Sequence, residues 1–360
     1  MKGRMNPNGL FSLNEHLETV EDDMLEMLDE IVDFEIFRER ITEHLGYGYK
    51  PQGGRPPFDP VVMFKILILQ GMHNLSDKKT ERQVRAYLPW MLFLGFEFGD
   101  AMPDENTIRH FRNRLTETGA LPVLIEAFEN ELKAHGYDAR SGHTVDASLV
   151  PAPRQRLTEE EKEAIKEGKS AEEVWPDEPN KAAQKDVDAR WVKRTKVYRG
   201  PDGKPKQQIV KMEYGWNFHI NSDNKYKFVR KHAVTPANVH DSQCFKYLVD
   251  CDNTARVVYA DSAYFSEETE EFLKEEGIRS KIIRKKPKGK PMPAATARAN
   301  SKKAEKRSRV EHVFGHMKNR FGLYIRTIGL ARAETKLSLA VLAYNIDRFI
   351  FLERRRYSMG

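Results

Sequence analysis

Apolar residues recur at helical spacing in the first third of the chain. Asp59 followed by Pro60 marks a helix start, because an acidic cap precedes proline at the first helical position. The apolar run 61–72 predicts that this helix is buried, and Ser76 and Asp104 begin two more, over 78–88 and 105–115. The pattern therefore predicts a compact all-helical unit over 60–117. Upstream, over 14–45, one face of acidic amphipathic helices carries Leu17, Val20, Met24, Leu25, Leu28 and Ile31.

Short apolar runs replace this pattern after a helix over 121–135 that ends at Gly136. We expect strands over 143–149, 212–220, 228–235, 255–260 and 278–283, with helices over 241–249, 267–276, 310–321 and 335–353. This order predicts an α/β domain with a mixed sheet. The charged, proline-rich stretch 154–205 interrupts it and is interpreted as an insertion, helical around 158–168 and 180–194.

The charge of the chain is unevenly distributed. Its 360 residues carry a net charge of +6, yet 14–35 holds ten acidic residues and no Lys or Arg, whereas 279–309 holds thirteen Lys or Arg and one acid. A local charge of +12 favours a polyanionic partner such as nucleic acid over a solvated linker.

Neither the cysteines nor the apolar runs suggest a secreted or membrane protein. The spacing of Cys244 and Cys251 fits no zinc pattern and no signal peptide is apparent, so reduced cysteines and a cytoplasmic location are expected. The most apolar run, 337–343, is too short to span a bilayer.

Three carboxylates stand in apolar surroundings. Asp146 lies in the first predicted strand, Asp261 directly follows another, and Glu311 lies near the start of a predicted helix. Acids in such places are usually paired or bound to a metal, and ligands at open α/β sheets bind at the carboxyl ends of strands. Converging oxygen ligands suit Mg²⁺ or Mn²⁺. The chain has 54 acidic residues, however, so spacing alone also permits a strand-end Asp and a surface Glu.

Two cations share a helix flank with Glu311. Arg307 and Lys318 lie within about 40° of it on a wheel of 100° per residue, beside the stripe of Val310, Val313, Phe314, Met317 and Phe321. Carboxylates for metal ions and cations for a polyanion would then face one cleft.

The amino-acid sequence around these residues resembles that of transposases of bacterial insertion sequences, of the IS5 group within the wider IS4/IS5-like DDE class. The matching segments are 143–148, 233–242, 260–264 and 307–315 with Lys318, and the helical unit from Gly54 also matches. The resemblance covers about 35–350. It implies an RNase H-like fold in which Asp146, Asp261 and Glu311 are the catalytic metal ligands.

This chain departs from the signature of the class at one position. Arg307, Glu311 and Lys318 match the class, but Ala304 stands where a tyrosine is expected. Only 49 residues separate Asp261 from Glu311, too few for the large β insertion of some relatives. His240, Asp241 and His312 also lie inside the motifs, where supporting and packing roles are both open.

The resemblance also implies partners and a domain plan. Double-stranded DNA, as terminal repeats and target, would be bound by a homodimer, with contacts from Arg307, Lys318, Arg309, Lys285, Lys286, Arg109 and Arg112. The plan is an acidic helical region 1–50, a helical DNA-binding or dimerisation domain 51–136, a catalytic domain 137–330 containing the insertion 154–205, and a C-terminal helix with a basic tail 331–360. Two alternatives stay open: another RNase H-like metal-dependent nuclease, and an inactive DNA-binding protein derived from a transposase.

Overall fold

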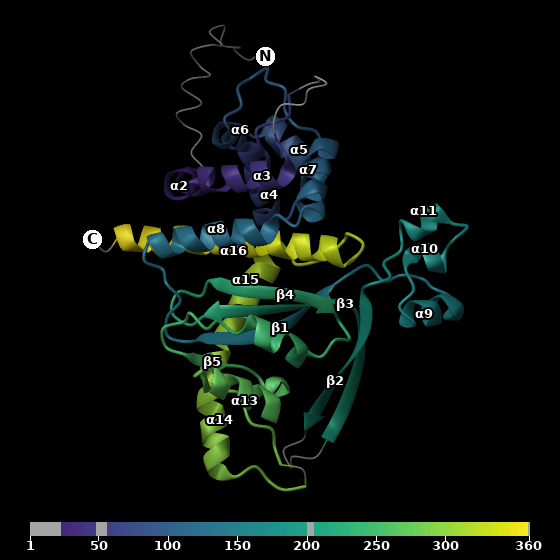
Figure 1. Ribbon diagram of the computed structural model, residues 1–360, viewed down its shortest axis with the longest axis vertical. Helices are drawn as coiled ribbons and strands as arrows, with labels where there is room; N and C mark the ends of the chain where they lie inside the picture. The colour runs from purple at the N-terminus through teal and green to yellow at the C-terminus, as the bar shows by residue number, and fades with distance from the viewer. Residues whose placement is uncertain (1–22, 48–55, 200–204, 288, 359–360) are drawn as a thin grey trace, which may run out of the picture. The chain divides into compact units, whose positions relative to one another are not determined.

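The computed structural model describes residues 23–47, 56–199, 205–287 and 289–358 (Figure 1). The predicted apolar positions Leu17 and Val20 and the motif residues Gly54 and Arg55 lie outside these ranges. The chain divides into two compact units, Met1–Phe128 with Asn345–Gly360, and Glu129–Tyr344. Among the described helices, none has the length and apolar content needed to cross a membrane. The predicted boundaries at residues 50, 136 and 330 stay predictions.

The first unit is helical, as the sequence pattern predicts. The side chain of Asp59 accepts hydrogen bonds from the backbone N–H groups of Val61 and Val62 at the start of α4. Ser76 and Asp104 cap α5 and α7 in the same way. Its elements are α2 (Asp23–Ile31), a 3₁₀ turn (Phe34–Phe37), α3 (Arg38–Leu45), α4 (Pro60–Met72), α5 (Asp77–Ala86), α6 (Leu88–Leu94), α7 (Glu105–Glu117) and the first part of α8 (Leu121–Ala134).

The second unit is built on a mixed six-stranded sheet. The order is β2-β3-β1-β5-β6, and β4 pairs with β3. β1 is antiparallel to β3 but parallel to β5, and β5 is parallel to β6. The prediction of a mixed sheet is thus confirmed. The strands are β1 (His143–Pro151), β2 (Arg190–Arg199), β3 (Pro205–Asp223), β4 (Val229–Pro236), β5 (Val257–Tyr259) and β6 (Arg279–Ser280).

β3 is the longest strand and holds the sheet together. It pairs with β2 up to Gly215, and beyond that residue it lies between β1 and β4. A side chain at Gly215 would place its Cβ 2.2 Å from the carbonyl oxygen of Val150, so only glycine fits where β3 changes partner.

The helix predicted over 180–194 is wrong beyond Ala182. Arg190–Arg199 is strand β2, because Val192, Thr195 and Val197 favour a strand and β3 offers a partner for its whole length. The helical part of the insertion is confirmed and comprises α9 (Glu159–Lys166), α10 (Ala171–Val174) and α11 (Pro179–Ala182). These short helices bury Ile165, Trp175 and Ala182 against one another as a small core of their own.

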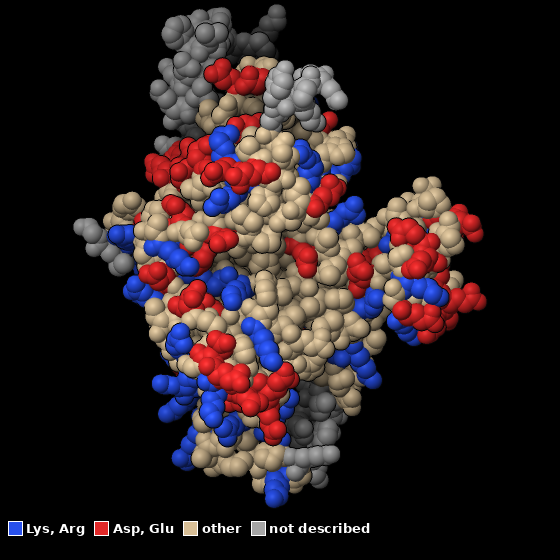
Figure 2. Space-filling view, in the orientation of Figure 1, with Lys and Arg blue, Asp and Glu red and all other residues tan. Residues whose placement is uncertain are grey.

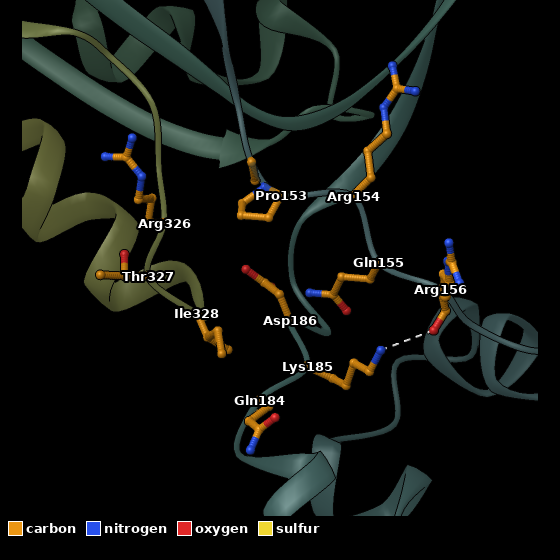
Figure 3. A pocket seen from close by; sticks show the side chains of 11 residues that line it. Pro153, Arg154, Gln155, Arg156, Gln184, Lys185, Asp186, Arg326, Thr327 and Ile328 are labelled. Carbon is orange, nitrogen blue, oxygen red and sulfur yellow. Dashed lines mark hydrogen bonds between the residues drawn. The ribbon is translucent and has the colours of Figure 1, made fainter.

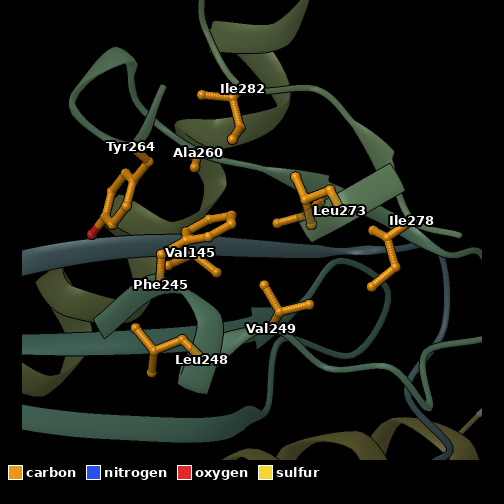
Figure 4. Packing of buried hydrophobic residues seen from close by; sticks show 10 residues of the cluster. Val145, Phe245, Leu248, Val249, Ala260, Tyr264, Leu273, Ile278 and Ile282 are labelled. Atoms are coloured by element: carbon orange, nitrogen blue, oxygen red, sulfur yellow. The ribbon is translucent and has the colours of Figure 1, made fainter. Parts of the chain in front are cut away.

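Helices and short turns cover the sheet. A buried cluster that includes Val145 of β1, Val258 of β5 and Phe245 fixes β1 against β5 (Figure 4). The basic stretch 279–309, for which no helix was predicted before residue 310, contains a helix, α14. The covering elements are two 3₁₀ turns (Asp241–Cys244 and Ser262–Tyr264), α12 (Phe245–Leu248), α13 (Glu267–Glu275), α14 (Ala294–Arg307), α15 (Arg309–Phe321) and the part of α16 (Leu330–Tyr357) that precedes Asn345.

A buried cation ties β3, β4 and α8 together and gives a stability prediction. Arg230 is 3% exposed and bonds Asp223, which is fully buried, and Glu129. Arg230→Met would leave both acids without their cation and should lower the free energy of unfolding by about 3–5 kcal/mol in urea denaturation. Arg140→Met removes the exposed pair with Asp138 and should cost less than about 1 kcal/mol. Equal effects of the two substitutions would contradict the assigned role of Arg230.

Candidate active site

Asp146 and Asp261 are brought together by the register of two parallel strands. His143 of β1 pairs with Val258 of β5, and Thr144 pairs with Tyr259. Continued by two residues, this register sets Asp146 opposite Asp261. β5 ends at Tyr259 while β1 continues, so both acids lie at the edge where the chain of β5 leaves the sheet.

Local hydrogen bonds orient these two carboxylates. One oxygen of Asp146 accepts from the N–H of Ala147 at 3.0 Å, and one oxygen of Asp261 accepts from the N–H of Ser262 at 2.5 Å. Each carboxylate keeps its second oxygen for other partners. Tyr264 closes the turn after Asp261 with its ring buried, and its hydroxyl has no hydrogen-bond partner within the described part of the chain.

Glu311 and Arg307 reach this edge from the junction of two helices. α14 lies against β5 and α15 against β1, and the break between them falls at Ser308. The apolar stripe of α15 is buried as predicted, and Phe314 packs edge-to-face on Phe218 of β3. The stripe faces the sheet, so Arg307 and Glu311 lie on the flank beside it.

The guanidinium of Arg307 joins two of the predicted catalytic acids. Its Nη1 donates to Asp146 at 2.7 Å and its Nη2 donates to Glu311 at 3.1 Å. Asp146 is 16% exposed, whereas Glu311 is 62% exposed. A single cation therefore links a buried carboxylate on a strand to an exposed carboxylate on a helix.

Burial raises the pKa of Asp146 to about 6. Arg307 opposes this shift, while the negative charges of Asp261 and Glu311 raise the pKa further. Asp261 and Glu311 therefore both lie within electrostatic range of Asp146. A bound cation would reduce the repulsion between these negative charges.

Lys318 lies further along the same helix flank. Its Nζ donates to the hydroxyl of Ser148 at 2.5 Å, two residues beyond Asp146 on the same face of β1. Burial lowers the pKa of Lys318, as does the nearby charge of Arg194 on β2, and Glu213 opposes them. Ser148 and Arg194 were not predicted as site residues. The position of Ser148 two residues after Asp146 is a usable sequence signal, whereas nothing in the sequence marks Arg194.

Asp241 contacts β3 and lies near Asp261. Asn217 of β3 donates to its carboxylate at 3.3 Å, and Nδ1 of the fully buried His219 lies 3.9 Å from it. Burial raises the pKa of Asp241, and the charge of Asp261 adds to that shift. The sequence motif 233–242 thus supplies an additional acid close to Asp261. His240 uses its Nδ1 to contact Ser242 instead.

The chemistry of this donor set fits a hard divalent cation. Carboxylate oxygens from Asp146, Asp261 and Glu311 are the ligands that such ions prefer. Among the described residues no three acidic, His or Cys side chains are already arranged to hold a metal ion. Arg307 occupies the place between Asp146 and Glu311, so metal binding requires its guanidinium to change partners.

The residues predicted to contact DNA fall into two groups. Arg309, Lys286 and Arg109 are exposed, and Lys285 is exposed while donating to the carbonyl of Phe265. Figure 2 shows basic side chains gathered over α14 and acidic ones over α13. Arg112 differs, because both its terminal nitrogens bond the carboxylate of Asp77, between α7 and α5.

Comparison with known proteins gives matches to two family models, a curated relative and a solved structure. The model of the family described as "Transposase DDE domain" matches residues 138–346, and the one described as "Transposase domain (DUF772)" matches residues 12–114. The transposase for insertion sequence element IS1106 of Neisseria meningitidis serogroup B is 26% identical over 243 residues, covering 66% of this chain and 75% of the relative. A structure of piggyBac transposase in a synaptic complex with hairpin DNA aligns with a TM-score of 0.40 and 11% identity, covering 93% of this chain and 76% of the other.

The chain belongs to the DDE transposases. The predicted RNase H-like fold, a mixed sheet flanked by helices, is therefore confirmed, as is a helical N-terminal region. The protein is a DNA transposase, an enzyme that cleaves and transfers DNA strands. Activity in this family depends on divalent metal ions.

The raised pKa of Asp146 predicts a stability gain on neutralising it. The pKa in the folded state, about 6, exceeds the usual 3.8, so the folded protein binds more protons between these values. Stability therefore falls as pH rises through this window and stays lower above it. Asp146→Asn should stabilise the metal-free protein at pH 7.5 by up to about 3 kcal/mol and have little effect at pH 3.5. Thermal unfolding in EDTA at both pH values measures this, and a destabilised variant at pH 7.5 would refute it.

Proposed function

We propose that Asp146, Asp261 and Glu311 form the carboxylate centre at which this transposase cleaves and joins DNA. The observation that carries the proposal is the bridge of Arg307 between Asp146 and Glu311, at the strand edge where the register also brings Asp261. The residues come from positions far apart in the chain. A cluster of acids around one cation is expected where divalent ions bind.

The ion that best fits these ligands is Mg²⁺, with Mn²⁺ as a substitute. Asp146, Asp261 and Glu311 would hold it. When bound, it supplies Lewis-acid chemistry at the phosphodiester and an activated hydroxyl nucleophile. Arg307, released from the acids, is then free to contact a DNA phosphate beside them.

The cations around the centre would position the DNA. Lys318 lies on the same flank, and its bond to Ser148 keeps the ammonium near Asp146. The basic segment with Lys285, Lys286 and Arg309 supplies the positive surface that follows the phosphate backbone. Contacts to phosphates do not depend on the base sequence, so these residues would bind the transposon end and target DNA alike.

In the helical unit we assign the DNA contact to Arg109 rather than to Arg112. Arg109 is exposed on α7, whereas Arg112 is 17% exposed and stabilises the packing of α7 on α5 through Asp77. A role of this unit in recognising terminal inverted repeats is part of the proposal, as is its alternative role in dimerisation.

The assembly and cellular setting follow from the reaction. Two ends of an insertion sequence must be handled together, so we propose a homodimer on DNA, acting in the bacterial cytoplasm. Membership of the IS5 group stays a prediction from the motifs. The three retained acids favour an active enzyme over an inactive derivative, and joining of strands separates a transposase from a simple nuclease.

Substitution of the acids tests the centre directly. Asp146→Asn, Asp261→Asn and Glu311→Gln should each lower cleavage of an end-bearing duplex by at least about a thousandfold in Mg²⁺, because each removes a metal ligand. Binding of the same duplex should persist. Glu305→Gln, an exposed acid on α14, serves as the matched control and should cleave normally. Wild-type cleavage by any of the three variants would remove that residue from the centre.

Lys318 gives a second test that separates positioning from metal binding. Lys318→Gln removes a charge beside the scissile strand and should lower cleavage about ten- to a hundredfold. The Mg²⁺ concentration for half-maximal cleavage should stay unchanged, since Lys318 is not a ligand. A large shift in that concentration with an unchanged maximal rate would argue against the assignment.

A further inference from the structure

A second polar site lies where the insertion joins the sheet. A pocket of about 470 Å³ is enclosed by the segment after β1, the segment before β2 and the segment before α16 (Figure 3). Its lining includes Arg154, Gln155, Lys185, Arg326 and Thr327. The volume falls in the range of small-molecule sites. Neither the sequence motifs nor the carboxylate centre involve these residues.

Hydrogen bonds to the backbone and to a buried carboxylate hold the three walls in place. The N–H of Ile325 donates to the carbonyl of Pro151 at 3.1 Å. The hydroxyl of Tyr214 donates to the carbonyl of Asp186 at 3.3 Å. Asp186 itself is buried, and its carboxylate accepts from the N–H groups of Asp188, Ala189 and Gly329. The pocket is therefore built into the fold, and its only lining acid is already engaged.

Two polar atoms of the lining lack partners. Oε1 of Gln155 and the hydroxyl of Thr327 are shielded from solvent and make no hydrogen bond to any described residue. Leaving such groups unpaired costs about 1–3 kcal/mol each, so a ligand that pairs them would be bound favourably. Gln155 extends into the space between the segments in Figure 3.

The rim of the pocket is cationic and carries an aromatic side chain. Arg154, Arg156, Lys185 and Arg326 supply positive charge. The guanidinium of Arg154 lies 5.5 Å from the ring centre of Trp191, which is 39% exposed on β2. Cations beside an exposed aromatic ring are the combination that binds the phosphates and bases of a nucleic-acid strand.

We propose that this pocket binds one unpaired nucleotide of the DNA substrate, which rests on the proposed action of the chain on DNA ends. Arg154 and Arg326 hold the phosphate, and the base enters the pocket, where Gln155 and Thr327 bond its polar edge. Trp191 stacks on the neighbouring base. An amide and a hydroxyl are suited to base edges, since each can donate and accept.

The test uses the full chain and three probes. These are a fluorescent duplex bearing one end of the insertion sequence, the corresponding single strand, and deoxyadenosine monophosphate alone. Arg154→Gln with Arg326→Gln should weaken single-strand binding about tenfold and lower the slope of log affinity against log salt by about 1. Gln155→Leu should weaken it about fivefold with the slope unchanged, because it removes no charge. Lys166→Gln with Lys169→Gln, on the insertion but outside the lining, is the control and should bind like wild type.

The possible outcomes distinguish a failure of the pocket proposal from a failure of the proposed carboxylate centre. If wild type cleaves the duplex while the pocket variants bind and cleave like the control, the pocket has no role in DNA binding and the proposal is overturned. If the free monophosphate binds wild type but not Gln155→Leu, and strand binding is unchanged, the ligand is a free nucleotide and the DNA assignment is wrong. If wild type neither binds nor cleaves end-bearing DNA, it is the proposed centre that fails. Circular dichroism confirms that each variant is folded.

Discussion

The pairing of β1 with β5 is the constraint on which the rest of the site depends. Two parallel pairs, His143 with Val258 and Thr144 with Tyr259, set the register that carries Asp146 and Asp261 to the same edge. A slip of one residue would turn Asp146 to the opposite face, among the apolar side chains that pack around Val145. The buried cluster between the strands therefore positions the proposed carboxylate centre as well as stabilising the fold. In the observed register the apolar residues are buried and Asp146 faces α15.

The sequence marks the residues of the proposed site through local signals. Asp146, Asp261 and Glu311 each stand in a short motif, and carboxylate oxygens point to a hard divalent cation as the ligand. The helix caps at Asp59, Ser76 and Asp104 were found because capping is a local interaction. What escaped prediction is non-local. The first half of β2 lies in the predicted helix 180–194 and forms a strand because β3 extends far enough to pair with it.

The same reasoning explains why the roles of the cations could not be read from spacing. A helix wheel places Arg307, Glu311 and Lys318 on one flank, and the flank is correct. The wheel assumes one continuous helix, however, whereas the chain breaks at Ser308 and Arg307 ends α14. Arg112 and Arg109 likewise share a helix, yet Arg112 is committed to Asp77 while Arg109 is exposed. Sequence shows which residues carry charge, and only the packing of other elements decides which charges remain available.

Arg307 links the stability of the protein to its chemistry. Burial raises the pKa of Asp146, and the negative charges of Asp261 and Glu311 raise it further. The guanidinium of Arg307, bonded to both Asp146 and Glu311, opposes this shift and so offsets part of the cost of the buried charge. Divalent ions carry more charge and would displace it from the acids. In the proposed centre the displaced guanidinium would lie beside the DNA phosphate, so the group that stabilises the metal-free site would also contact the substrate.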